Sequence, residues 1–274
     1  MIDALGYTFI QNALIAGILV SITAGIMGSL IVVNRMVFLT GGVAHSSYGG
    51  IGAAIYFGIP IFLGASIFAV ASALLIAWFS IRHRERTDTF IGLVWSAGMA
   101  MGVIFTDLTP GYNSDLMSYL FGSILAVEKD DIVMMAILTV IVVLSVHIWY
   151  REILAVSYDR EYASLRGIPD KKIYTAILVL ASLTVVVAIK VVGLILVIAL
   201  MSVPTYISER ISGSLYSMMM LSALLSVLFT IGGLILSYRF DLTSGACIIL
   251  LSTVAMALFT IAEKIFGKRG SSIS

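Results

Sequence analysis

The sequence predicts an all-α, polytopic membrane protein, a bundle of about eight or nine transmembrane helices in a single domain spanning residues 1–274. Hydrophobic residues make up 60% of the chain and charged residues 11%, whereas a soluble domain carries about 25% charged residues. The charges are clustered, so the apolar stretches between them approach the roughly 20 residues that cross the hydrocarbon core of a bilayer. Mean hydropathy is +1.10, and soluble enzyme folds are excluded.

Apolar stretches between charged or turn-forming residues give the expected spans. They lie near 9–33, 42–58, 61–80, 89–106, 132–149, 173–189, 191–207, 214–237 and 244–263. The stretch 112–127 is short, rich in small residues and contains Asp115, so we expect a re-entrant or interfacial segment there. The charged stretch 150–172 connects the fifth span to the sixth, and Lys190 marks the expected break between the sixth span and the seventh.

The distribution of Lys and Arg predicts the orientation, because cytoplasmic loops carry an excess of these residues. With the block 82–86 in the cytoplasm, all of the 16 basic residues except Lys129, Lys190 and Arg239 lie inside. We therefore expect the N-terminus outside and the C-terminus inside.

The connector 150–172 is expected to contain one short helix. Asp159 is a suitable N-cap, Gly167 a suitable helix end, and Pro169 prevents continuation of the helix. A small surface at Ala163 and Gly167 is suited to docking in a groove on a soluble partner. An ordinary interfacial connector is the alternative interpretation.

The second expected span is rich in small residues. Gly42, Ser46, Gly50 and Ala54 recur at four-residue intervals, which allows the backbone of another helix to approach closely.

His45 lies on the same span, in its cytoplasmic half. An ionisable residue within a membrane segment is a functional-site hypothesis, and neutral imidazole is a good ligand for borderline divalent metals. The alternative is a buried histidine that is hydrogen-bonded to a neighbouring helix.

Several other classes of function find no support in the sequence. Cys247 is the single cysteine, which excludes an intramolecular disulfide and a cysteine-based metal cluster. A net charge of +1 gives no indication of a nucleic-acid partner. Phosphate-binding loops, nucleophile elbows, HExxH motifs and carboxylate dyads are absent from the sequence. We therefore expect no enzyme activity in this chain.

Five stretches, which are distributed along most of the chain, resemble the permease subunits of ATP-binding-cassette (ABC) importers for zinc, manganese and iron, in the same order. They are 41–46 (GGVAHS), 119–125 (YLFGSIL), 159–167 (DREYASLRG), 192–200 (VGLILVIAL) with Pro204, and 240–245 (FDLTSG).

The resemblance implies a permease domain of the type II importer architecture, working as a homodimer in a bacterial or archaeal cytoplasmic membrane, with the pathway between the protomers. Two cytoplasmic ATPase subunits would dock on a coupling helix at 159–167, and an extracytoplasmic metal-binding protein would deliver the ion. The permease would bind no nucleotide or other cofactor, because the partner ATPases use the ATP. The implied site residues are His45 as a metal ligand and Asp159, Glu161, Ala163 and Gly167 as coupling residues.

One position departs from the family pattern. Members commonly place an Asp four residues before the histidine, where this chain has Gly41. Another group could supply the missing oxygen, the ion could pass with fewer protein contacts, or the substrate could differ. Import of zinc or manganese is the leading expectation, and import of a metal chelate such as cobalamin, haem or a siderophore is the alternative. An ion-gradient-driven secondary transporter is a further alternative, although few ionisable residues lie within the spans.

Overall fold

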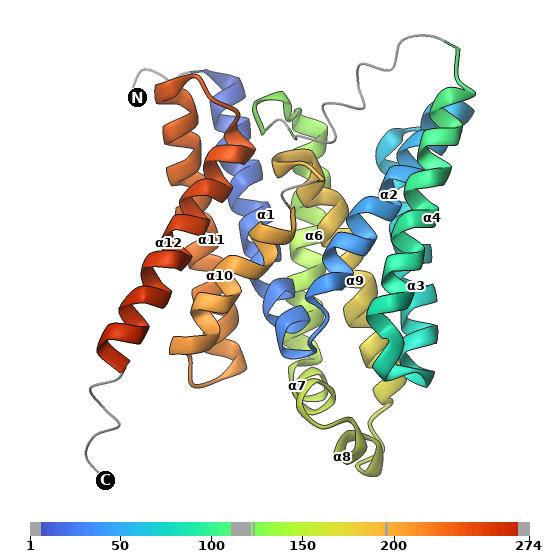
Figure 1. Ribbon diagram of the computed structural model, residues 1–274, viewed down its shortest axis with the longest axis vertical. Helices are drawn as coiled ribbons and strands as arrows, with labels where there is room; N and C mark the ends of the chain where they lie inside the picture. The colour runs from blue at the N-terminus through green and yellow to red at the C-terminus, as the bar shows by residue number, and fades with distance from the viewer. Residues whose placement is uncertain (1–6, 111–121, 123, 195–196, 268–274) are drawn as a thin grey trace.

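The computed structural model describes residues 7–110, 122, 124–194 and 197–267. This part of the chain is a bundle of long helices, and it contains no β-strand (Figure 1). The helices are α1 (Thr8–Val33), α2 (Val37–Phe57), α3 (Ile61–Arg82), α4 (Thr87–Asp107), α6 (Lys129–Ile148), α7 (Tyr150–Tyr158), α8 (Arg160–Leu165), α9 (Asp170–Val192), α10 (Val197–Ile211), α11 (Leu215–Phe240) and α12 (Ser244–Gly267), with short 3-10 turns at η2 (Arg84–Arg86) and η3 (Ile124–Ala126). The predicted all-α polytopic bundle is confirmed.

Seven helices of the described part are long and apolar enough to cross a membrane: α1, α3, α4, α6, α9, α11 and α12. The chain is therefore a multi-pass membrane protein. The remaining expected spans correspond to α2, which is rich in glycine and serine, and to α10, which has 15 residues. At 1.5 Å per residue, α10 extends only about 22 Å, less than the roughly 30 Å hydrocarbon core. The expected count of eight or nine spans is thus approximate.

The break between the sixth and seventh spans is not at Lys190. Helix α9 continues through Lys190 to Val192 and ends at Gly193, whose φ is +87°. Glycine adopts positive φ at little cost, so the helix ends there, and Lys190 within the helix forms an ion pair with Asp131. Most of the expected re-entrant stretch 112–127 lies outside the described residues; its described end forms η3.

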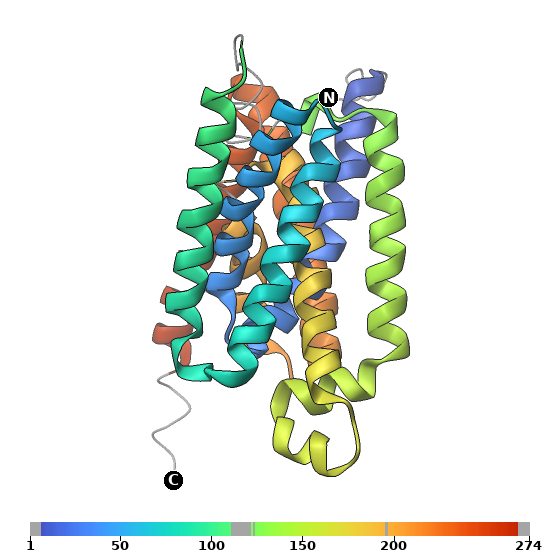
Figure 2. The same cartoon turned by 90° about the vertical axis from the view of Figure 1, so that its right-hand side faces the viewer.

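The connector 150–172 forms two short helices rather than one, and both project beyond one end of the bundle (Figure 2). The predicted caps of α8 are confirmed. The Asp159 side chain accepts a hydrogen bond from the backbone N–H of Tyr162 at 2.9 Å. Gly167 has φ +77°, and the next N–H, that of Ile168, donates to the carbonyl of Ala163 at 3.0 Å, as in a Schellman C-cap.

The two ends of the bundle differ in the elements they carry. Helices α7 and α8, the turn η2 and the last turn of α12 lie at one end, which we call the α8 end (Figure 1). The start of α1 lies at the opposite end. Because α6 leads into α7, and α9 leads away from α8, the start of α6 and the end of α9 also lie opposite the α8 end.

Small residues bring α2 close to its neighbours, as predicted. A Cβ atom placed at Gly98 of α4 would overlap the Cα of Ser46, and one placed at Gly50 would overlap the backbone of Gly64 in α3. Substituting any side chain at these glycines would therefore push helices apart. Helices α2, α3 and α4 form a tightly packed group that holds His45.

Candidate functional site

The imidazole of His45 on α2 stacks on the indole of Trp95 on α4. The ring centroids are 4.1 Å apart and the ring planes differ by 9°. The indole is held in turn, because its Nε1–H donates to the Sδ atom of Met99 at 3.3 Å. Phe38 lies against the indole with a centroid separation of 5.8 Å. Sequence reasoning found His45 but not Trp95, whose role depends on a contact between two helices.

The Nδ1 atom of His45 is buried and has no hydrogen-bond partner within the described residues. Buried polar atoms are nearly always paired, so this unpaired ring nitrogen marks His45 as the candidate ligand of the site. The alternative of a structural histidine held by a hydrogen bond from a neighbouring helix gains no support from this geometry, because the observed contact is a ring stack.

Gly41 lies one helical turn before His45, at the place where α2, α4 and α10 meet. A Cβ atom at Gly41 would lie 2.7 Å from Cδ1 of Ile198 and 3.3 Å from Cζ3 of Trp95. Apolar side chains thus occupy the space beside His45 that a second ligand on the preceding turn would use. Across the described residues, there is no group of three or more His, Cys, Asp or Glu that could hold a metal ion.

Helix α8 presents a different surface from the one expected. Asp159, Glu161 and Gly167 are exposed, but Ala163 is fully buried and packs toward the core. Leu165 is 88% exposed and is the large apolar side chain at the outer surface of α8. The two residues of the expected small surface therefore differ, because Gly167 is exposed and Ala163 is buried. The sequence analysis did not identify Leu165 as part of the exposed surface of α8. Residues two positions apart, such as Ala163 and Leu165, lie on different sides of a helix. This spacing could have shown that Leu165 is exposed if Ala163 is buried.

Arg160 connects α8 to the bundle. Its guanidinium carbon lies 3.4 Å from the centroid of the Tyr174 ring on α9, and the Tyr174 hydroxyl lies 2.7 Å from Oγ of Ser80 on α3. Burial lowers the pKa of the Arg160 guanidinium. Arg160 thus joins α8 to α9, and through Tyr174 to α3.

A cleft of about 800 Å³ opens at the α8 end beside Tyr174. Helix ends and connectors of the bundle supply its charged lining, which includes Arg35, Arg84, Glu85, Asp88 and Glu209. The lining of the cleft therefore carries charges of both signs.

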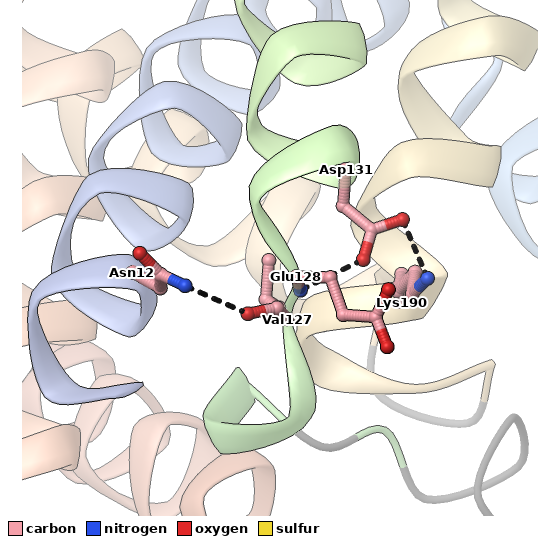
Figure 3. Close-up of polar contacts among 5 residues, drawn as sticks. All are labelled: Asn12, Val127, Glu128, Asp131 and Lys190. Carbon is pink, nitrogen blue, oxygen red and sulfur yellow. Dashed lines mark hydrogen bonds and ion pairs between the residues drawn. The ribbon is translucent and has the colours of Figure 1, made fainter. Parts of the chain in front are cut away.

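The opposite end is held by a polar network (Figure 3). Lys190 Nζ lies 2.6 Å from Oδ1 of Asp131, and Asp131 Oδ2 accepts the backbone N–H of Glu128 at 3.0 Å. Asn12 of α1 donates to the carbonyl of Val127 at 3.3 Å. From the sequence, Lys190 was expected only to mark a break between two spans. In the structure, it forms an ion pair that joins α9 to α6.

The described part of the chain is a multi-pass helical bundle from one end of which two short helices project, and this is the architecture of an integral membrane protein. The chain belongs to the ABC 3 transport family, which matches residues 6–263. Its relatives include membrane proteins of metal transport systems, and the chain is accordingly a transport subunit rather than an enzyme.

Known proteins with similar sequences include an uncharacterized membrane protein of Synechocystis sp., which is 44% identical over 93% of this chain and 91% of its own length. The manganese transport system membrane protein MntC of Listeria monocytogenes is 33% identical over 96% of this chain and 93% of its own. Among solved structures, PsaBC from Streptococcus pneumoniae in complex with Fab contains a chain that superimposes with a TM-score of 0.85 at 29% identity, covering 94% of this chain and 93% of that chain.

Proposed function

We propose that this chain is the membrane-spanning subunit of an ATP-driven importer of divalent metal ions, with zinc or manganese as the substrate. The single observation that carries the proposal is the buried, unpaired Nδ1 of His45 within the tightly packed α2. The similarity to manganese and other metal transport system membrane proteins supports the same substrate class.

The proposed assembly is a homodimer with the pathway between the two protomers. A zinc ion usually takes four ligands, and the described part of one chain offers an isolated imidazole. A twofold axis duplicates each residue, so a dimer brings a second His45 to the pathway. Water or carbonyl oxygens would complete the coordination of an ion in transit.

Coupling to ATP hydrolysis is proposed to run through α8. Two cytoplasmic ATPase subunits would contact its exposed surface, which includes Asp159, Glu161 and Leu165. Movement of α8 would reach α9 through the Arg160–Tyr174 contact. The permease itself would bind no nucleotide or other cofactor, and an extracytoplasmic metal-binding protein would deliver the ion.

We place the α8 end in the cytoplasm, in a bacterial or archaeal cytoplasmic membrane. The basic turn η2 and the basic connector around α8 lie at this end, as expected for cytoplasmic segments. The N-terminus is then outside and the C-terminus inside. A cysteine introduced at Ser164, which is exposed on α8, should react with an impermeant thiol reagent only from the cytoplasmic side.

The test of the function is uptake of radiolabelled zinc and manganese by proteoliposomes that contain this chain, its ATPase and its binding protein, with and without internal ATP. ATP-dependent accumulation that is lost in His45→Ala supports the proposal. A complex that hydrolyses ATP but accumulates neither ion would contradict it and favour a metal chelate as cargo. Uptake driven by an ion gradient without ATP would favour a secondary transporter.

A further inference from the structure

Among the described residues, the side chains seen against His45 and in the space of the preceding turn carry no carboxylate. The indole of Trp95 covers one face of the imidazole, and Ile198 and Trp95 fill the space beside Gly41 on the preceding turn. The nearby hydroxyls of Ser46 and Ser47 both donate to the carbonyl of Val43, at 3.0 and 2.7 Å. The contacts seen at the imidazole and on the preceding turn are therefore aromatic or aliphatic, and the hydroxyls of the two serines that follow His45 in the chain are already hydrogen-bonded.

Ligand type decides which divalent ion such a site favours. Imidazole suits zinc, copper, iron and nickel, whereas carboxylate, carbonyl and water oxygens suit manganese, magnesium and calcium. For a given nitrogen-containing site, manganese is also the weakest binder of the divalent first-row series. An imidazole without an adjacent carboxylate therefore discriminates against manganese.

We propose that His45 and Trp95 form a carboxylate-free selectivity site, in which Trp95 positions the imidazole and the site favours zinc over manganese. This inference rests on the proposed function and narrows its substrate. Trp95 is a positioning residue, since it acts through the ring of His45. Met99 fixes the indole by accepting the Nε1–H bond, so the stack keeps the imidazole in one orientation.

The primary test is competition between radiolabelled zinc and manganese for the purified permease–ATPase complex, without the binding protein. We expect the wild-type complex to prefer zinc by about tenfold or more at equal concentrations. Preference for manganese would overturn the inference while leaving metal import intact. Binding of neither ion by this complex would overturn the inference, whereas the proposed function is tested separately by the uptake assay that includes the binding protein.

A carboxylate introduced beside His45 provides the matched test. Ile198→Val removes the Cδ1 atom that would crowd residue 41, so Gly41→Asp is made in that background and Gly41→Ala in the same background is the control. We expect Asp, but not Ala, to shift the zinc-to-manganese binding ratio toward manganese by about tenfold. Equal ratios for the two variants would overturn the inference.

The positioning role of Trp95 has its own readout. Replacing Trp78 and Trp149 by Phe leaves Trp95 as the single tryptophan, so its fluorescence reports on the neighbouring imidazole. Zinc should change this fluorescence, and His45→Ala should abolish the change. Trp95→Phe, which retains an aromatic ring for stacking, should bind zinc better than Trp95→Ala. Zinc binding that is identical in these two variants and in the wild type would overturn the positioning role.

Discussion

Lys190 on α9 and Asp131 in the first turn of α6 form an ion pair, with Nζ and Oδ1 2.6 Å apart (Figure 3). The exposed fractions of the two side chains are 32% and 16%, so the pair is neither fully solvated nor fully buried. Asp131 also takes part in the capping box of α6, because its other carboxylate oxygen accepts a hydrogen bond from the backbone N–H of Glu128. The two partners of the pair are therefore not equivalent.

Removing Asp131 should destabilise the protein more than removing Lys190. Lys190→Met loses the ion pair, whereas Asp131→Ala loses the pair and part of the cap, and loss of a cap costs about 0.5–2 kcal/mol. The unfolding temperature of the purified protein in detergent should be highest for the wild type, lower for Lys190→Met and lowest for Asp131→Ala. Lys190→Arg retains the charge and is the control; equal unfolding temperatures for the two disruptive variants would contradict the assigned roles.

The close packing of α2 on α4 should make Gly98 intolerant of a side chain. A Cβ atom at Gly98 would overlap Ser46, whereas a Cβ at Gly92, one and a half turns earlier on α4, would meet no atom within 4 Å. Gly98→Ala should therefore lower the unfolding temperature and impair metal uptake. Gly92→Ala should be neutral or slightly stabilising, since alanine is favoured over glycine in a helix by up to about 1 kcal/mol. Similar behaviour of the two variants would contradict the packing.

Local signals in the sequence predicted those features that depend on nearby residues. Asp159 and Gly167 cap α8 as expected, because a cap is a bond between residues a few positions apart. The small-residue stripe of α2 was also readable, since helical periodicity sets it. The fold class followed from the composition and from the clustering of the charges between long apolar stretches.

The features that were missed depend on contacts between distant segments. The sequence alone indicates a helix break at Lys190, because its ion-pair partner Asp131 lies 59 residues away in the chain. The sequence predicts Ala163 as part of a docking surface, but α8 packs on the bundle so that Ala163 is buried. The stack of His45 on Trp95 arises where two helices meet, and no local pattern specifies it.

The exposed apolar side chain of Leu165 should contribute to binding of the ATPase. Leu165→Asp places a charge at a position that is 88% exposed, so the permease should fold normally and lose affinity for the ATPase. Co-purification and ATPase stimulation are the measurements. Leu165→Met preserves an apolar side chain and is the control. Normal ATPase binding by Leu165→Asp would exclude this residue from the docking surface.

We expect the backbone conformation of Gly167, rather than its small size, to be important for transport. Its φ of +77° is unfavourable for other residues, and no atom lies within 4 Å of a Cβ placed there. Gly167→Ala should thus strain the end of α8 by about 1–2 kcal/mol and reduce transport per ATP hydrolysed. Gly167→Asn should be milder, because asparagine enters the left-handed region more readily. If bulk rather than conformation mattered, asparagine would be the more harmful replacement.

Arg160 should be required for coupling rather than for folding of the membrane helices. Its guanidinium carbon lies 3.4 Å from the Tyr174 ring centroid, and Tyr174 is fixed by Ser80 at 2.7 Å. Arg160→Ala removes this link between α8 and α9. We expect ATP hydrolysis by the assembled complex to continue while metal uptake falls.

The ratio of metal ions transported to ATP hydrolysed is the measurement for Arg160. Arg160→Lys retains a cation that can lie over an aromatic ring, so it should keep more of the wild-type ratio than alanine does. Tyr174→Phe keeps the ring but loses the hydroxyl contact with Ser80, and it should give an intermediate ratio. A normal ratio in Arg160→Ala would show that α8 moves α9 by another route.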